Sequence, residues 1–131
     1  TLITHFEEWA TENDIWILAG HNPSFDIGFL LEVHERRNRN SLTQARHWDF
    51  GHRFVDIHSV CFSHMIRNSF QPPEAGLGLD EILIYVGLKA RRGFHNALED
   101  AKLEAEAFHR LVFGTHLLPE YEALVVPKFL E

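Results

Sequence analysis

Two hydrophobic patterns alternate along the chain: short apolar runs, and longer stretches with apolar residues every three or four positions. The run over residues 16–19 ends at Gly20 and predicts a buried strand. A second strand is predicted over residues 53–57. The periodic stretches around these strands predict helices, so the pattern favours an α/β layer structure. Because two strands are marginal on their own in water, the predicted sheet is incomplete.

Two predicted helices flank the first strand. One ends near Ala10. The other begins with Asn22 as its N-cap and Pro23 at its first helical position, and we expect it to continue to about Arg36. The residues that this second helix would place on one face are Phe25, Phe29, Leu30 and Val33.

Two further helices follow the second strand. The first runs through Cys61 and Met65, and we interpret Cys61 as a core residue. A loop over residues 71–76 contains proline and glycine, and the next helix ends at Gly87. The apolar positions of that helix are Leu79, Ile82, Leu83 and Val86.

The strongest helical pattern covers residues 97–112. Asn96 precedes it, and the spacing from Asn96 to Glu99 is a variant of the capping box. Its predicted apolar face consists of Ala97, Ala101, Ala105, Phe108, Leu111 and Val112. Residues 117–130 predict a short packing helix with an extended end, to which no function is assigned.

Composition narrows the class of protein. The 131 residues suit one domain, residues 1–131, and 45% apolar with 24% charged residues is an ordinary globular balance. A single cysteine fits a reducing, cytoplasmic compartment. No apolar run reaches the ~20 residues of a membrane span, so we expect no membrane partner. The formal charge of -7 argues against a protein that coats nucleic acid, but not against an enzyme that acts on it.

Three residues near predicted helix starts suggest chemistry. Asp26 and Asp100 each fall in a first turn, and His95 lies five positions before Asp100. Phosphoryl-transfer enzymes use carboxylates to hold Mg²⁺ or Mn²⁺, and histidine suits the deprotonation of water near neutral pH. The alternative is structural, because the helix dipole alone favours an aspartate in a first turn.

Two strings extend this interpretation. HNPSFDIGFL, residues 21–30, resembles the second motif of the DEDDh exonucleases, and HNALED, residues 95–100, matches their third motif. The motifs stand in the family order, and residues 54–60 and 77–82 resemble the elements between them. The resemblance covers roughly residues 6–113. The family includes the proofreading subunit of bacterial DNA polymerase, ribonuclease T and oligoribonuclease, and it implies a ribonuclease H-like fold.

The resemblance implies a metal-dependent 3′–5′ exonuclease, a phosphodiesterase that releases nucleoside monophosphates from single-stranded DNA or RNA. Asp26 and Asp100 would bind the metal ions of a two-metal site, and His95 would be the general base. Asn22 and Phe25 would shape the substrate pocket. The residues themselves leave another interpretation open, in which Asn22 is only a helix cap and Phe25 belongs to the core.

The first motif of the family, Asp-x-Glu, has no counterpart here, since the sequence contains no such triplet. We therefore expect a C-terminal portion of a longer exonuclease, without its N-terminal strands. The exposed strand edge would favour a homodimer or pairing with the missing N-terminal segment. Two-metal catalysis by these residues alone should fail or be weak. The alternative is a catalytically inactive relative that binds nucleic acid or a polymerase-like partner.

Basic residues supply a candidate nucleic-acid path. Arg91 and Arg92, with Lys89, lie just before His95, where the resemblance places the lip of the site. A second basic segment is either a further contact or a solvated insertion, and contains Arg36, Arg37, Arg39, Arg46 and Arg53. Trp48 and Phe50 could stack on a base, but a hydrophobic anchor for the loop is the favoured interpretation. Nothing in the sequence separates DNA from RNA as the substrate.

Overall fold

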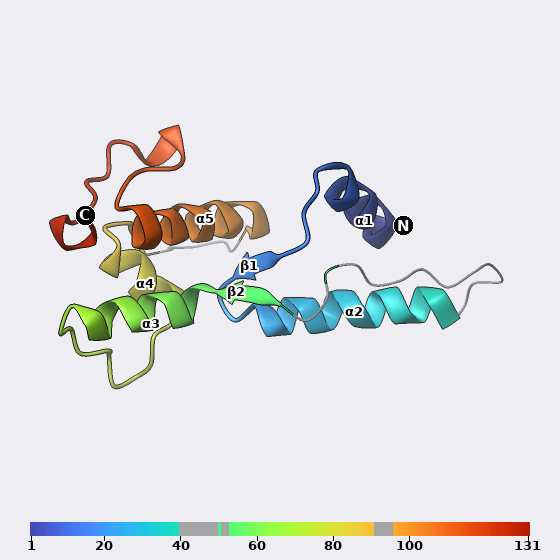
Figure 1. The fold of residues 1–131 in the computed structure, drawn as a ribbon, viewed down its shortest axis with the longest axis horizontal. Helices are drawn as coiled ribbons and strands as arrows, with labels where there is room; N and C mark the ends of the chain where they lie inside the picture. Colours follow the sequence, from blue (N-terminus) through green and yellow to red (C-terminus); the bar gives the residue numbers. More distant parts are fainter. Residues whose placement is uncertain (40–49, 51–52, 91–95) are drawn as a thin grey trace. The chain divides into compact units, whose positions relative to one another are not determined.

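The computed structural model describes residues 1–39, 50, 53–90 and 96–131 (Figure 1). The chain divides into two compact units: unit 1 is Thr1–Val55 and unit 2 is Asp56–Glu131. The expectation of one domain over residues 1–131 stays a prediction.

Unit 1 contains helices and a small sheet. Its elements are α1 (Leu2–Glu12), β1 (Leu18–Gly20), α2 (Pro23–Arg39) and β2 (Phe54–Asp56), the last residue of which begins unit 2. In the described part of the chain, β1 and β2 form one parallel two-stranded sheet (Figure 1). The predicted α/β class is confirmed at this level.

The first strand is shorter and less buried than the sequence predicts. It begins at Leu18 rather than at residue 16, and Trp16 and Ile17 are exposed. The chain leaving α1 turns back first, with the Ile15 N–H donating to the Ala10 carbonyl at 2.8 Å. Residues 16 and 17 therefore precede the paired part of the strand: the predicted strand exists, but its start and its burial are wrong.

Helix α2 begins at Pro23 as predicted and ends three residues beyond the expected Arg36. Asn22 has φ of 56°, in the left-handed region that asparagine tolerates better than most residues. Its side-chain oxygen accepts a hydrogen bond from the Ser24 hydroxyl at 3.0 Å. The predicted helix start is confirmed, with asparagine in a turn conformation just before it.

The predicted apolar face of α2 is exposed. Phe25 is 73% and Phe29 is 69% exposed, and Val33 also faces solvent, so the interpretation of Phe25 as a core residue is wrong. The buried residues of the helix are Pro23 and His34. Amphipathic spacing predicted the helix correctly but gave the wrong buried side.

Polar contacts between α1 and α2 explain that difference. The Glu7 carboxylate lies 2.5 Å from Nδ1 of the buried His34 and 3.0 Å from a guanidinium nitrogen of Arg37. Arg37 also donates to the Thr4 hydroxyl at 2.8 Å, and the Asn38 amide lies 2.9 Å from Nε2 of His34. The side of α2 that meets α1 is thus held by ion pairs and hydrogen bonds instead of by its phenylalanines.

Unit 2 is built around an apolar core. Its elements are α3 (Ile57–Arg67), α4 (Leu79–Tyr85), α5 (Ala97–Phe113) and the 3₁₀ turns η1 (Pro119–Tyr121) and η2 (Lys128–Leu130). The three helices predicted between the second strand and residue 113 are confirmed. The buried core residues are Ile57, Cys61, Met65, Leu77, Leu79, Ile82, Leu83, Val86, Leu88, Ala107, Leu111 and Leu130.

Cys61 lies in this core, as predicted. Burial raises the pKa of its thiol to about 12, so the thiolate is not available near neutral pH. Asp56 caps α3 by accepting the backbone N–H groups of His58 and Ser59. The core and this cap fix α3 at both its inner face and its start.

Helix α5 starts as predicted, and its buried face agrees only in part with the predicted one: Leu111 is buried and Phe108 packs against the core. The Asn96 side chain accepts the backbone N–H groups of Leu98 at 3.0 Å and of Glu99 at 3.4 Å. The alanines of the predicted apolar face, Ala97, Ala101 and Ala105, are exposed. Besides Leu111, the helix buries Glu106, Ala107 and Arg110, which were not predicted.

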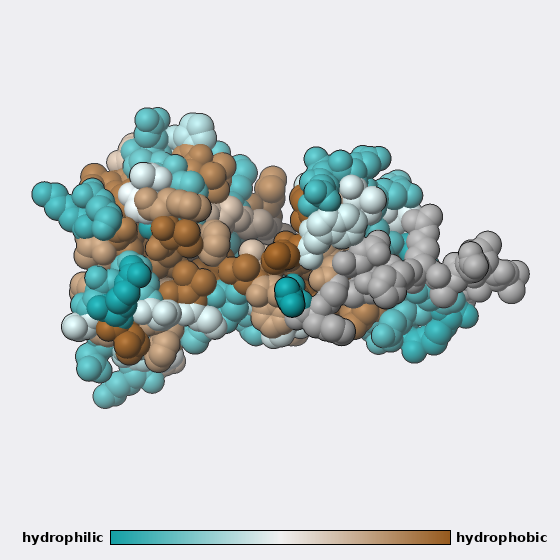
Figure 2. Space-filling model, viewed as in Figure 1, coloured by the Kyte–Doolittle hydropathy of each residue, from teal (hydrophilic) through white to brown (hydrophobic). Residues whose placement is uncertain are grey.

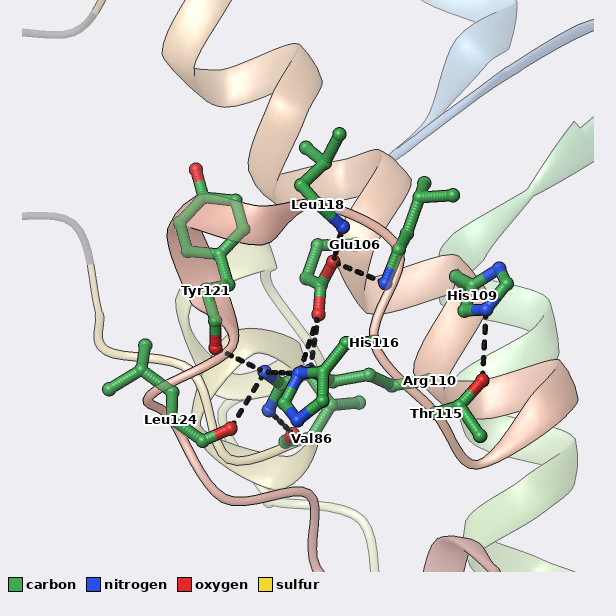
Figure 3. A network of polar contacts seen from close by, with 10 residues as sticks. Val86, Glu106, His109, Arg110, Thr115, His116, Leu118, Tyr121 and Leu124 are labelled. Atoms are coloured by element: carbon green, nitrogen blue, oxygen red, sulfur yellow. Dashed lines mark hydrogen bonds and ion pairs between the residues drawn. The ribbon is translucent and has the colours of Figure 1, made fainter.

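A buried ion pair explains why α5 can turn charged residues inward (Figure 3). Glu106 and Arg110, both fully buried, pair at 2.8 Å. The Arg110 guanidinium donates to the carbonyls of Val86, Tyr121 and Leu124. Buried charges are tolerated when they are paired and their remaining hydrogen-bonding groups are satisfied.

The same pair fastens the C-terminal segment to α5. The backbone N–H groups of Leu117 and Leu118 donate to the Glu106 carboxylate at 2.9 and 2.8 Å (Figure 3). Burial raises the pKa of Glu106, but hydrogen bonds from Arg110 and these two N–H groups lower it below its ordinary value. The segment packs as predicted, but it forms two 3₁₀ turns where a short helix with an extended end was expected, and the second turn buries Leu130.

Candidate metal and nucleic-acid site

Asp26 is an accessible carboxylate at the start of α2. The helix begins at Pro23, so Asp26 is its fourth residue, and its side chain is exposed. It forms no hydrogen bond or ion pair within residues 1–39, 50, 53–90 and 96–131. An anionic side chain is stabilised at a helix N-terminus, and its oxygens are ligands that Mg²⁺ and Mn²⁺ accept.

Asp100 occupies the equivalent position of α5. The helix begins at Ala97, so Asp100 is again the fourth residue, and its backbone N–H donates to the Asn96 carbonyl at 2.9 Å. Its side chain is half-buried. The adjacent Glu99 is exposed and pairs with Lys102 at 3.2 Å.

The predicted site residues fall in different parts of the chain. Asp26 belongs to unit 1 and Asp100 to unit 2, and each is placed within its own unit. The predicted base His95, with Arg91 and Arg92, lies outside the described residues. The structure therefore shows where each carboxylate lies on its own helix. That the two bind metal ions together stays a prediction.

Acidic neighbours neutralise much of the predicted second basic segment. Arg36 and Arg39 pair with Glu32, and Arg37 pairs with Glu7. The Arg36 hydrogen bond and charge hold the pKa of Glu32 below its ordinary value. For these three arginines, the contacts favour the interpretation of a solvated segment over that of a nucleic-acid contact.

Phe50 is a hydrophobic anchor, as the favoured interpretation holds. Its ring is buried and stacks on Phe6, with ring centroids 5.2 Å apart. Trp48 and Arg46 lie outside the described residues.

No group of three or more histidine, cysteine, aspartate or glutamate side chains gathers at one point in the part of the chain that the structure describes. A complete metal site is thus not present in those residues, although Asp26 and Asp100 have the right donor chemistry for Mg²⁺ or Mn²⁺. Two other potential ligands are engaged elsewhere: His58 stacks on Phe62, and His64 contacts the Tyr85 hydroxyl at 2.9 Å. Among the described helices, none combines the length and apolarity needed to span a bilayer.

Two features of unit 2 were not predicted from the sequence. One is the Glu106–Arg110 pair, whose spacing of four residues is a signal that was available. The other is a cavity beside α3 that contains Arg67. Comparisons with protein-family models, with curated proteins and with solved structures give no match.

Proposed function

We propose that this chain is a metal-dependent 3′–5′ exonuclease of the DEDDh type, with a ribonuclease H-like fold. It would hydrolyse single-stranded DNA or RNA from the 3′ end and release nucleoside monophosphates. The observation that carries the proposal is a repeated local arrangement. In both motifs an asparagine, Asn22 or Asn96, directly precedes a 17-residue helix, and an aspartate, Asp26 or Asp100, is the fourth residue of that helix.

Each motif residue has a role in this proposal. Asp26 and Asp100 would supply oxygen ligands for Mg²⁺ or Mn²⁺, which would polarise the terminal phosphodiester and neutralise its developing charge. His95 would accept the proton of the attacking water. Phe25, being exposed, is available to stack on a base beside Asn22. Arg91 and Arg92 would attract the phosphate backbone of the strand.

The second candidate function is a non-catalytic module that binds single-stranded nucleic acid or a polymerase-like partner. The observation that favours it is the lack of an Asp-x-Glu triplet in the 131 residues, which leaves two of the family's four metal-site carboxylates without a counterpart. Fewer carboxylates hold two divalent ions less well, so binding could persist where cleavage does not.

Digestion of a 5′-labelled single strand, DNA and RNA in parallel, tests the proposal. With Mn²⁺, the chain should produce a weak ladder that shortens by one nucleotide at a time from the 3′ end, because only two of the family's four metal-site carboxylates have a counterpart. Asp100→Asn should abolish the ladder, whereas His95→Ala should slow it by ~10²–10⁴-fold, as loss of a general base does. Glu99→Gln is the matched control, because it removes one negative charge from the same helical turn, and it should cut at the parental rate.

The same samples separate the two candidate functions. Fluorescence anisotropy of the labelled strand reports binding whether or not cleavage occurs. Binding without a ladder would favour the non-catalytic module. A ladder that persists in both Asp100→Asn and His95→Ala would show that other residues carry out the reaction.

A further inference from the structure

A cavity of about 380 Å³ opens beside α3 in unit 2, with α5 contributing to its wall. Pockets for small ligands begin at about this size, and typically combine apolar walls with a few polar groups. The lining residues, all of them in unit 2, are Ser59, Val60, Ser63, His64 and Arg67 of α3 and Leu111 of α5.

Arg67 is the positive charge of this cavity. It forms no ion pair within the described residues, although the whole chain has 19 acidic residues and only 12 lysines and arginines. Most other arginines that the structure describes do pair with a glutamate: Arg36, Arg37, Arg39 and Arg110. No carboxylate lines the cavity, so its charge is not compensated from within.

Two hydroxyl groups lie in line with Arg67. Ser59, Ser63 and Arg67 are spaced by four residues, which places them one above another along α3. The Ser59 hydroxyl already donates to Asp56 at 2.7 Å, so that end of the line is acidic. The Ser63 hydroxyl forms no hydrogen bond with the described residues, and is free to donate beside Arg67.

His64 adds polarity to the cavity without adding charge. It is buried, and its Nδ1 lies 2.9 Å from the Tyr85 hydroxyl. Burial, together with the nearby charge of Arg67, lowers its pKa from the ordinary value. At neutral pH the imidazole is therefore uncharged, and Arg67 alone makes the charge of the cavity positive.

We propose that this cavity binds a phosphate monoester with an apolar substituent. The phosphate would pair with the Arg67 guanidinium and accept the Ser63 hydroxyl, because a guanidinium binds phosphate oxygens in a bidentate way and phosphate has a third oxygen for the hydroxyl. The substituent would lie on Val60 and Leu111. This site is independent of the proposed exonuclease activity, since none of its residues belongs to the two motifs.

Titration of the full chain with three probes, followed by amide NMR shifts, tests the proposal. Phenyl phosphate combines both features, inorganic phosphate has only the charge, and benzyl alcohol has only the apolar ring. Phenyl phosphate should shift α3 and Leu111 amides saturably, and bind at least about fivefold more tightly than either other probe, since both features contribute to its affinity. Equal affinity for all three, or no saturable shift, would overturn the proposal.

Variants locate the binding. Arg67→Gln should weaken phenyl phosphate binding by about tenfold or more, the loss expected for a charge-assisted hydrogen bond, and Arg67→Lys should lie between it and the parent. Arg53→Gln is the matched control, because Arg53 is also exposed and unpaired within the described residues. Unchanged spectra of the free variants would show that they fold. Equal binding by Arg67→Gln and Arg53→Gln would contradict the assignment.

A phosphate monoester can belong to a small metabolite or to the end of a nucleic-acid strand. A 5′-phosphorylated thymidine dinucleotide distinguishes these sources. Tighter binding than phenyl phosphate, lost in Arg67→Gln, would indicate a strand end. Weaker binding would indicate a small metabolite and would leave the phosphate assignment supported by phenyl phosphate.

Discussion

Units 1 and 2 differ in the interactions that hold their helices together. Unit 2 encloses twelve buried apolar residues and adds a fully buried ion pair at its edge. Unit 1 buries few apolar side chains, and joins α1 to α2 mainly through the carboxylate of Glu7. Its large apolar residues Trp16, Phe25 and Phe29 stay exposed.

This difference shows that amphipathic spacing alone does not decide which face of a helix is buried. In unit 2 the C-terminal segment, residues 117–130 (the tail), supplies carbonyl and N–H groups. These groups satisfy the hydrogen-bonding capacity of the buried Arg110 and Glu106 side chains. Even there, Ile66 and Ile84 are exposed. Figure 2 shows hydrophobic brown atoms among teal ones on the visible face of the molecule. The buried ion pair and the close packing of the tail should therefore dominate the stability of unit 2.

The largest effect is expected from Arg110→Ala. It leaves the Glu106 carboxylate buried without its partner, which typically costs about 3–5 kcal/mol. Denaturant unfolding followed by circular dichroism measures this. Arg36→Ala, which removes an exposed pair at the same four-residue spacing, is the control and should change stability little. Similar losses of unfolding free energy in the two variants would contradict the claim that the buried pair matters more than the exposed one.

A smaller effect is expected where the tail crosses two glycines. Gly87 and Gly114 have φ of 79° and 67°, and a Cβ there would lie 2.6 Å from the Val125 carbonyl oxygen and 2.7 Å from that of Leu130. Alanine at either position should cost about 2 kcal/mol or more, because backbone clash adds to the ~1–2 kcal/mol of left-handed strain.

Gly76→Ala separates the two contributions. Gly76 has φ of 99°, but nothing lies within 4 Å of the position that an added Cβ would take. In the same denaturant unfolding measurement, Gly76→Ala should lose only the cost of left-handed strain, about 1–2 kcal/mol. If it were destabilised as much as Gly87→Ala, close packing of the tail would not be the cause.

The stability of unit 2 should also depend on pH. The folded state lowers the pKa of His64, so the unfolded chain takes up its proton first as pH falls. Stability is therefore full above the ordinary histidine pKa and declines as pH falls below about 6.5, by at most ~1.4 kcal/mol per pH unit for one proton. Unfolding at pH 7.5 and 5.5 measures the slope. His64→Gln should reduce it, whereas substitution of the exposed His5 should leave it unchanged.

The smallest effect, and one of opposite sign, is expected in unit 1. Gly28 lies inside α2 with nothing within 4 Å of an added Cβ. Gly28→Ala should stabilise the helix by about 0.5–1 kcal/mol, because alanine has the better helix propensity. Local hydrogen exchange of α2 amides measures this change. Destabilisation by Gly28→Ala would mean that the added methyl group meets another part of the protein on this face of α2.

Much of the secondary structure could be predicted from the sequence, because periodicity and caps are local. The start of α5 at Asn96 and the burial of Cys61 followed from neighbouring residues alone. The buried side of α5 did not, because Arg110 is satisfied by carbonyls up to 24 residues away. A hydrophobic pattern predicts that a charged residue such as Arg110 faces solvent.

The candidate site was predictable only as separate pieces. Motif spacing placed Asp26 and Asp100 correctly at helix starts. It could not show that Phe25 is exposed, since that depends on which side of α2 meets α1. The cavity at Arg67 depends on how α3 and α5 pack, and Arg67 has no ion-pair partner among the described residues; spacing encodes neither property.

Metal binding precedes cleavage, so a Mn²⁺ titration followed by electron paramagnetic resonance tests the central proposal most directly. The chain should bind Mn²⁺, and Asp26→Asn and Asp100→Asn should each weaken binding by at least about tenfold, as loss of a metal-site residue does. Glu99→Gln should bind like the parent. Equal binding by all four proteins, or no binding at millimolar Mn²⁺, would contradict the assignment of Asp26 and Asp100 as metal ligands.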